Sequence, residues 1–396
     1  MTKKEMLLLI LLASINFTHI MDFMIIMPLG SYLMPLFKIN PQQFSFIVTA
    51  YTFAAGIVGF SAAFFVDRFD RKKVLLTGYA GFIIGTFACA FAPSYLLLIA
   101  ARIFAGAFGG LIGAQVMSIV ADSFPFERRG KAMGIMMGAF AFAAAIGVPT
   151  GLFLAKNFGW HFPFIVIGCI GVLVFVLVSF KIPNMIGHIQ LAEHRPSPWS
   201  VITNIKKDKN QQRALLLMVT LMIGHFSIIP FIAPYMEFNV GFTKDQVTLI
   251  YFVGGVVSIM SSAFVGSMSD KHGKLKVFTI FALLSTIPVF MLTNMPREPY
   301  YLVLIVNAFF FIFAGGRMIP AQAMVSAVVL PQHRGGFMSI SGSLGQIASG
   351  VAALLAGSII QKMPTGELLN YQYVGYIGIT LSVVCVLIAR KVKAIS

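Results

Sequence analysis

The sequence predicts an all-α integral membrane protein whose twelve transmembrane helices form two pseudo-symmetric six-helix bundles. Composition, a series of long apolar runs and an internal repeat predict this fold. Of the 396 residues, 58% are hydrophobic and 11% are charged, whereas soluble domains average about 45–50% apolar and about 25% charged residues. This composition excludes a soluble protein and a disordered chain.

The apolar runs predict the helices. A helix needs about 20 predominantly apolar residues to cross the hydrocarbon core of a membrane. Twelve such runs follow one another, at 6–36, 44–66, 74–92, 95–122, 132–155, 160–182, 213–236, 244–267, 275–294, 299–329, 335–361 and 371–390. Because their polarity does not alternate along the chain, they do not predict the strands of an outer-membrane barrel.

The first run begins after two lysines and resembles a secretory signal. It continues through Asp22 to Pro35 without a clear cleavage site, so we interpret it as the first spanning helix. The three cysteines, Cys89, Cys169 and Cys385, all lie inside apolar runs. We expect buried thiols rather than a disulfide framework.

The basic residues predict the orientation. Twenty-two Lys and Arg residues fall on one side of the predicted membrane and five on the other, with Arg102 and Arg317 inside helices. By the positive-inside rule, both termini and the long loop are cytoplasmic. Together with the short loops, this predicts a multi-pass protein of a plasma membrane. The net charge of +16 largely reflects this bias, so we expect no nucleic-acid partner.

A polar stretch with three prolines divides the runs six from six. We therefore predict an N-terminal six-helix bundle at 1–182, a cytoplasmic linker at 183–212 and a C-terminal six-helix bundle at 213–396. Within the linker, apolar residues recur at helical spacing from Trp199 to Ile205. A short helix on the bilayer surface and a solvated loop both fit this pattern.

Four correspondences between the halves indicate a tandem duplication. Asp67-Arg68-Phe69-Asp70-Arg71 matches Asp270-Lys271-His272-Gly273-Lys274 at an offset of 203, Arg129-Gly130-Lys131 matches Arg334-Gly335-Gly336 at 205, Arg102 matches Arg317 at 215, and Asp22-Phe23 matches His225-Phe226 at 203. The halves would share one orientation and enclose a central cavity. Asp22 and His225 are then expected to face each other across it.

These residues resemble the major facilitator superfamily, specifically its twelve-helix drug:proton antiporter and arabinose-efflux-like branch, over essentially the whole chain. The motifs are Ala63-x-x-x-Asp67-Arg68-x-Asp70-Arg71-Lys72 and its copy Gly266-x-x-x-Asp270-Lys271-x-Gly273-Lys274, His19 to Leu29, Arg102-x-x-x-Gly106-x-x-Gly109-Gly110, and Gly147-Val148-Pro149-Thr150-Gly151. The family usually has Gly at positions 63 and 70, and the proline of the last motif is displaced by one residue. The resemblance implies a proton-coupled exporter that works by alternating access without a cofactor.

The resemblance also implies a gate. In the family, the loop aspartate meets a neighbouring helix N-terminus and nearby arginines, a contact that breaks when the halves rock. A solvated charged loop is the alternative. The residues implied in gating are Asp67, Arg68, Arg71, Lys72, Gly147, Pro149, Gly151, Asp270, Lys271 and Gly273.

Asp22 is the strongest candidate for proton coupling. An ionised carboxylate near the middle of a span costs roughly 2.5–3.5 kcal/mol, so Asp22 must face the bundle interior, find partners or stay protonated. Asn16, His19 and Asp22 share one helix face, on which a histidine and an aspartate can exchange a proton. Arg102, by resemblance, and His225, by position, complete the candidate set. Structural hydrogen bonding is the alternative for each.

Polar residues inside the apolar runs are candidates for contacting substrate or for joining helices. They are Asn16, Tyr51, Gln115, His225, Tyr251, Asn307, Arg317, Gln322 and Gln346. The two intramembrane arginines cannot lose their charge, so each needs an acidic, carbonyl or water partner. A cavity with one acid and many apolar residues favours lipophilic or cationic compounds over sugars.

Small residues predict close helix packing. Glycines recur from Gly106 to Gly113 on the fourth helix, and Gly147 and Gly151 lie four apart on the fifth. Because small residues let backbones approach closely, we expect these two helices to pack tightly against each other.

Two alternative functions stay open. The same fold could serve a proton symporter or uniporter for a sugar or another small metabolite, or a lipid transporter. A membrane enzyme is not expected, because the chain has no HExxH, GxSxG or phosphate-binding loop and no Cys/His cluster with metal-ligand spacing. The expected partners are the lipid bilayer, a small-molecule substrate and protons. The fold needs no second subunit, so we expect a monomer.

Overall fold

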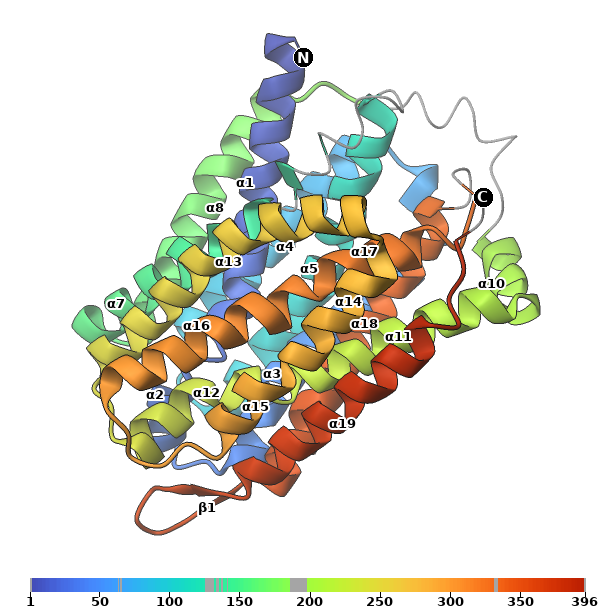
Figure 1. Cartoon of the computed structure of the whole chain (residues 1–396). Coiled ribbons are helices and arrows are strands. Elements are labelled where there is room, and N and C mark those ends of the chain that lie inside the picture. The colour runs from blue at the N-terminus through green and yellow to red at the C-terminus, as the bar shows by residue number, and fades with distance from the viewer. Residues whose placement is uncertain are drawn as a thin grey trace.

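The computed structural model describes residues 2–62, 64, 66–124, 132, 135–136, 138–140, 142–185, 198–330 and 334–394. Within these residues, twelve helices are long and apolar enough to span a membrane, which confirms the predicted fold class. The two chain termini lie at the same end of the bundle (Figure 1). We call this the terminal end and the opposite one the far end.

The first half contains α1 (Lys3–Ile25), α2 (Gly30–Leu36), α3 (Pro41–Ala62), the 3₁₀ turn η1 (Val66–Arg68), α4 (Arg71–Ala90), α5 (Tyr95–Ser123), the π-helical turn η2 (Ala143–Gly147), α7 (Val148–Phe158) and α8 (Phe162–Lys181). Helix α10 (Pro198–Lys207) follows in the linker. The linker therefore contains a short helix, one of the two structures that its sequence allows.

The second half contains α11 (Lys209–Phe226), α12 (Ile229–Tyr235), the π-helical turn η4 (Met236–Val240), α13 (Lys244–His272), α14 (Lys274–Leu284), α15 (Thr286–Thr293), α16 (Tyr300–Gly316), α17 (Met318–Ser326), α18 (Arg334–Ile359), β1 (Gln361–Lys362), β2 (Leu368–Leu369) and α19 (Tyr371–Ala389). The strands pair antiparallel, with Gln361 opposite Leu369. They form a short hairpin at the far end (Figure 1).

The first and seventh spans break in the same way. After α1, Pro28 precedes the short helix α2, and after α11, Pro230 is the second residue of the short helix α12. Proline lacks the amide hydrogen that continues a helix, which favours a break at these points. The shared break supports the duplication that the sequence motifs indicate.

Side-chain caps begin several of the helices. Thr2 and Thr243 form capping boxes at α1 and α13, and Asp208 accepts backbone hydrogen bonds at the start of α11. Such caps satisfy amide groups that a helix leaves unpaired at its first turn. They fix where these spans begin.

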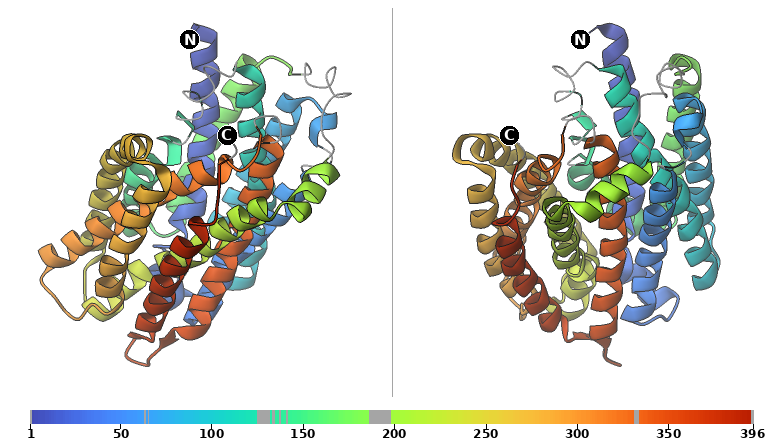
Figure 2. Two further views of the ribbon diagram at one scale, coloured as in Figure 1. Left: turned by 45° about the vertical axis from the view of Figure 1, so that its right-hand side comes forward. Right: turned by 90° about the vertical axis from the view of Figure 1, so that its right-hand side faces the viewer.

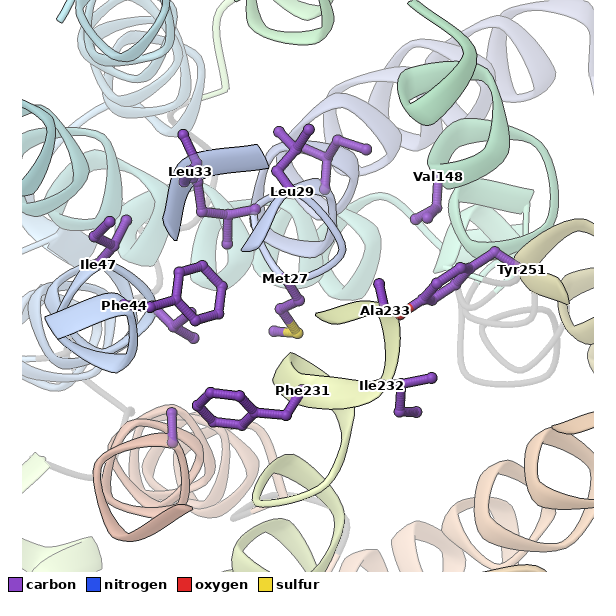
Figure 3. Packing of buried hydrophobic residues seen from close by; sticks show 14 of the residues in the cluster. Met27, Leu29, Leu33, Phe44, Ile47, Val148, Phe231, Ile232, Ala233 and Tyr251 are labelled. Atoms are coloured by element: carbon purple, nitrogen blue, oxygen red, sulfur yellow. The ribbon is translucent and has the colours of Figure 1, made fainter. Parts of the chain in front are cut away.

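At the terminal end each half has its own apolar core, whereas at the far end the two halves share one. One buried cluster, from Leu9 to Ile182, belongs to the first half, and another, from Ala214 to Ala389, belongs to the second. A third cluster joins both halves at the far end, where the rings of Phe44 and Phe231 lie 5.9 Å apart (Figure 3). The far end is therefore closed.

Helices α3 and α18 hold the halves together along their length, and Figure 2 shows them side by side. A Cβ atom on Gly357 would lie 2.5 Å from the Ser45 hydroxyl, and one on Gly56 would lie 2.6 Å from Ile347. Thr49 also donates a hydrogen bond to a backbone carbonyl of α18, at 3.0 Å. This pair of helices therefore forms a closely packed interface between the two halves.

Two packing expectations were wrong. The small-residue face of α5 packs against α3, since a Cβ on Gly110 would lie 2.2 Å from the carbonyl oxygen of Ala55. Gly147 and Gly151 instead face α1, within reach of Met21 and Ile25. The glycines of the fourth and fifth spans therefore contact different helices, and the described residues show no packing of these two spans through their glycines.

The second wrong expectation concerns the thiols, all of which were expected to be buried. Cys169 is exposed, whereas Cys89 and Cys385 are buried.

Candidate proton-coupling site

A buried ion pair joins α1 to α5. The Nη1 atom of Arg102 donates to Oδ2 of Asp22 at 2.7 Å and to the backbone oxygen of Asp22 at 3.3 Å. Neither side chain is exposed at all. Thr86 on α4 donates its hydroxyl to the other carboxylate oxygen, at 3.3 Å. The Asp22 carboxylate therefore has partners on two other helices of its own half.

An aromatic ring supports the arginine. The guanidinium carbon of Arg102 lies 4.2 Å from the centre of the Tyr51 ring, a favourable cation–π distance. The Tyr51 ring also stacks on Phe23 with centroids 5.8 Å apart. This arrangement requires a glycine at position 106, where a Cβ would lie 2.3 Å from the Tyr51 carbonyl oxygen. The glycine of the fourth-helix motif thus brings α3 close enough to stack Tyr51 under Arg102.

His19 lies beside this pair among aromatic rings. Its ring is 5.8 Å from that of Phe82 and 6.2 Å from that of Tyr51. A Cβ on Gly109 would lie 2.9 Å from His19 Nε2 and 2.6 Å from the Tyr51 hydroxyl. Both polar atoms are buried and form no hydrogen bond with a described residue. They are available to a proton, a water molecule or a solute.

Asn16 and Gln115 are the other buried polar candidates of the first half. Asn16 donates to the backbone oxygen of Met136 at 3.2 Å and so joins two helices. Gln115 is 1% exposed, and its Oε1 atom forms no hydrogen bond with the described residues. Asn16 thus joins helices, whereas Gln115 keeps a free acceptor.

Asp22 and His225 do not face each other, contrary to the sequence-based expectation. The Asp22 carboxylate turns into the first half, whereas His225 stacks on Phe310 of its own half, with centroids 6.3 Å apart. Their neighbours Phe23 and Phe226 meet between the halves instead, at 5.7 Å. Asp22 is paired inside its own bundle, whereas the buried Nδ1 atom of His225 forms no hydrogen bond with a described residue. Aromatic rings occupy the contact between the halves.

Arg102 and Arg317 are not counterparts in the fold. Arg102 lies seven residues after the start of α5, whereas Arg317 lies seventeen residues after the start of α16. Ten residues of helix correspond to about 15 Å. Asn307 occupies the position equivalent to Arg102, where it is buried and donates to the backbone oxygen of Val303 at 2.9 Å. The ion pair is therefore a feature of the first half alone among the described residues.

Arg317 has neutral partners. It is 1% exposed, and its Nη1 atom donates to the hydroxyls of Ser285 at 3.1 Å and Ser382 at 2.6 Å. No carboxylate of a described residue lies within ion-pair distance of it. The remaining substrate candidates are Tyr251, which points toward Ala233 of α12 (Figure 3), and the half-buried Gln322 and Gln346.

Most gating candidates of the first repeat lie near η1 and α4. The side chain of Asp67 lies outside the described part of the chain, Arg68 is exposed, and Arg71 is buried. Lys72 donates its ammonium to the backbone oxygen of Ser179, at 2.8 Å. In the second repeat, Asp270 and Lys271 are exposed, and Gly273 adopts a φ of 89° where α14 begins. Pro149 lies in the first turn of α7, after Gly147, which ends η2.

Asp70 of the loop motif, which sequence analysis did not place among the gating candidates, caps α4 and accepts a hydrogen bond from the Met185 amide at 2.9 Å. Three further residues were not named: Thr86 contacts Asp22, and Ser31 contacts Glu237. Of these three, Glu237 could have been found from the sequence, since an acid stands directly after the apolar run that ends at residue 236.

The chain also resembles proteins of known family. The sequence profile of the Major Facilitator Superfamily matches residues 12–224 and 214–394. The chain is 27% identical over 354 residues to the uncharacterized MFS-type transporter YceJ of Bacillus subtilis (strain 168), across 88% of each chain. It is 23% identical over 345 residues to the riboflavin transporter RibZ of Clostridioides difficile (strain 630), across 76% of each chain.

Two solved structures share the fold. A bacterial homolog of the human lysosomal transporter Spinster, in an inward-facing and occupied conformation, matches with a TM-score of 0.77 at 14% identity, over 99% of this chain and 97% of that one. A D-xylose-proton symporter matches with a TM-score of 0.77 at 17% identity, over 95% and 96%.

Twelve spanning helices in two related halves and a sequence shared with transporters define a multi-pass membrane transporter, not an enzyme. The chain belongs to the Major Facilitator Superfamily, which confirms the resemblance of its motifs. General secondary transport follows from this membership.

Proposed function

We propose that this protein exports small amphipathic or cationic compounds in exchange for protons, by alternating access. The observation that carries the proposal is the fully buried pair of Asp22 and Arg102, joined at 2.7 Å. Buried acids in membrane spans are costly and mark proton and ion pathways. No cofactor is needed in this scheme, because the proton gradient supplies the energy.

The pair can couple proton binding to a change in helix contacts. A proton on Asp22 would remove the negative charge that holds Arg102, leaving the guanidinium with Tyr51 and the backbone oxygen of Asp22. This would weaken the connection between α1 and α5, which lie in the same half. A cationic substrate would bind the ionised Asp22 carboxylate in competition with Arg102, and it would exclude a proton from that carboxylate. Substrate and proton would therefore bind alternately.

The aromatic contacts between the halves suit an amphipathic substrate. Phe23 and Phe226 meet at the interface beside the pair, and His225 stacks on Phe310 behind them. Flat apolar compounds bind well among such rings. A proton that enters the cell gains about 2.3 kcal/mol per 100 mV, which corresponds to a concentration ratio of roughly fifty for an uncharged exported compound. One-for-one exchange with a monovalent cation moves no net charge, so the pH difference alone would drive it.

The proposed setting is a bacterial plasma membrane, with a monomer whose termini are cytoplasmic. The excess of Lys and Arg in the predicted loops at the terminal end supports this orientation. The closed far end would then face outward, and the described conformation would be inward-facing. Substrate would enter from the cytoplasm or the inner leaflet.

Proton symport of a sugar or another polar metabolite is the second candidate, with uniport and lipid transport as further variants of the same fold. The buried Nε2 of His19 and hydroxyl of Tyr51, without partners among the described residues, would suit a hydroxylated solute. This candidate predicts proton movement in the same direction as the solute. Uniport and lipid transport predict no proton movement.

A proton-flux assay in proteoliposomes with an imposed pH gradient tests the proposal. Lipophilic cations, neutral drugs and sugars are added in turn to wild type, to Asp22→Asn and to Glu298→Gln. The last variant makes the matching acid-to-amide change at a residue between two spans. We expect one cationic or amphipathic class to collapse the gradient in wild type and Glu298→Gln but not in Asp22→Asn. Coupled transport that survives in Asp22→Asn would contradict the proposal.

A further inference from the structure

Glu237 is a half-buried carboxylate at the contact between the two halves. It lies in η4, between the buried residues Met236 and Val240, at the far end of the seventh span. Its Oε1 atom accepts a hydrogen bond from the Ser31 hydroxyl of α2 at 2.7 Å. Ser31 is buried and belongs to the first half. An acid of one half is thus held by the other half when the far end is closed.

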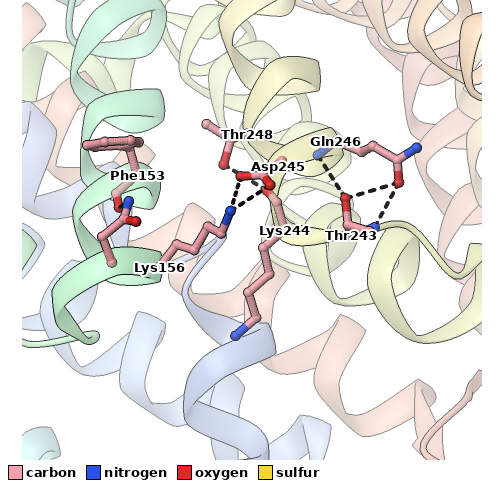
Figure 4. A network of polar contacts seen from close by, with 8 residues as sticks. Phe153, Lys156, Thr243, Lys244, Asp245, Gln246 and Thr248 are labelled. Carbon is pink, nitrogen blue, oxygen red and sulfur yellow. Dashed lines mark hydrogen bonds and ion pairs between the residues drawn. The ribbon is translucent and has the colours of Figure 1, made fainter.

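The charged groups around Glu237 also cross the contact. Lys244 on α13 places its ammonium 3.5 Å from the centre of the Tyr32 ring of α2. Lys156 on α7 forms an ion pair with Asp245 on α13 at 2.6 Å (Figure 4). Because those two charges neutralise each other, Lys244 is the cation whose charge acts on Glu237. The other titratable groups near η4 are Tyr32 on α2, Tyr235 at the end of α12 and Tyr251 on α13, together with Lys362 on β1, which lies 5.3 Å from the Phe238 ring.

This environment favours a neutral acid. An ionised carboxylate that leaves water is costly unless several partners compensate for its lost hydration, whereas a protonated acid can be buried with one hydrogen bond. Glu237 has one hydroxyl in contact and one lysine whose charge reaches it. When the halves separate at the far end, Ser31 and Glu237 part and the carboxylate meets water. Proton binding and closure are therefore thermodynamically linked.

We propose that Glu237 is a second proton-binding residue, which takes up its proton from the far side and in its protonated form stabilises the closed far end. Its use in export rests on the proposed antiport, in which protons arriving from outside return the transporter to its inward-facing state. The link between protonation and closure does not depend on that proposal, because it requires only that the far end opens and closes.

The test measures the opening of the far end against pH in the full-length protein in lipid nanodiscs. Spin labels are placed at two exposed positions, with Asn157→Cys on α7 of the first half and Arg297→Cys before α16 of the second. Cys169→Ser removes the exposed native thiol, while Cys89 and Cys385 are buried. Pulsed electron resonance then gives the label distance between about pH 5 and about pH 8.

The proposal predicts a shorter label distance as pH falls in the wild-type background. Glu237→Gln, a neutral mimic of the protonated acid, should give the short distance at every pH. Asp22→Asn should retain the wild-type response, which separates this proposal from the role of Asp22. Ser31→Ala leaves the acid in place and should move the midpoint, because the closed state loses a hydroxyl that contacts the acid.

Two results would overturn the proposal. One is a label distance in the wild-type background that does not change with pH, and the other is a wild-type response in Glu237→Gln. If Glu237→Gln does not yield folded protein, the Ser31→Ala variant decides, and an unchanged midpoint there counts against Glu237.

Discussion

The guanidinium of Arg102 is held from two directions, by the Asp22 carboxylate at 2.7 Å and by the Tyr51 ring at 4.2 Å. The first contact depends on the charge of Asp22, and the second does not. A residue placed in this way can lose one partner without losing its position. Protonation of Asp22 would therefore change the strength of the connection between α1 and α5 without leaving the arginine unsupported.

Tyr51 variants should separate its ring from its hydroxyl. Tyr51→Phe keeps the ring under Arg102 and should retain most proton-coupled transport, whereas Tyr51→Leu removes the cation–π contact, worth about 2 kcal/mol or more in a desolvated site. We expect Tyr51→Leu to shift the pH profile of transport in proteoliposomes and Tyr51→Phe to leave it nearly unchanged. If both variants shift the profile equally, the hydroxyl is the important group.

The Asp22–Arg102 pair should show strong coupling in stability. Removing one partner of a buried ion pair leaves an uncompensated charge and costs about 3–5 kcal/mol. Asp22→Asn and Arg102→Met should each lower the thermal unfolding midpoint in detergent, and the double variant should be more stable than the sum of the two losses predicts. Additive losses would show that the two side chains act independently.

Glycine substitutions on α13 should distinguish the contact between halves from ordinary helix positions. A Cβ on Gly255 would lie 2.1 Å from the Cα of Ala145 in η2 of the other half, so Gly255→Ala should hold the far end apart. A Cβ on Gly266 of the same helix would meet no heavy atom of a described residue within 4 Å. Gly266→Ala should stabilise the helix by roughly 0.5–1 kcal/mol.

The readout for these glycine variants is labelling of a cysteine placed at Met27, a buried residue of the shared far-end cluster. A membrane-impermeant thiol reagent should react faster in the Gly255→Ala background and at the unchanged rate in the Gly266→Ala background. Equal rates in both backgrounds would contradict a closure that depends on Gly255.

Arg317 should depend on its two hydroxyl partners. Hydrogen bonds to a charged group are worth about 1.5–3 kcal/mol each, so Ser285→Ala and Ser382→Ala should both lower the unfolding midpoint. Ser269→Ala is the matched control, since Ser269 is buried but its hydroxyl forms no hydrogen bond with a described residue. A control as damaging as the other two would assign the loss to packing.

Sequence patterns predicted the spans well because crossing a membrane requires length and apolarity, which are local properties. They also selected Asp22 and Arg102, since charged residues inside apolar runs are conspicuous. They could not show that the two side chains meet, because contacts between helices depend on the rotation of each helix about its axis. Ser31 and Thr86 illustrate this limit, as hydroxyls are common in membrane helices and only their position beside a carboxylate distinguishes them.

The register of the repeat misled the comparison of the two arginines. An offset of 215 between Arg102 and Arg317 departs by ten residues from the offset of 205 that relates α5 to α16. Two arginines on matching helices suggested equivalence, yet helix starts pair Arg102 with Asn307. The halves have kept their shape while their charged groups diverged, so the buried acid–arginine pair belongs to the first half in the described structure.

The shared apolar cluster at the far end also has a thermal consequence. Its rings and aliphatic chains, from Phe44 in the first half to Phe231 in the second, must enter water or lipid when that end opens. Hydrophobic association weakens on cooling. Where water fills the opened end, cooling should favour the open arrangement and warming the closed one. The fraction of this transporter that rests with its far end closed should therefore increase with the temperature at which its host grows.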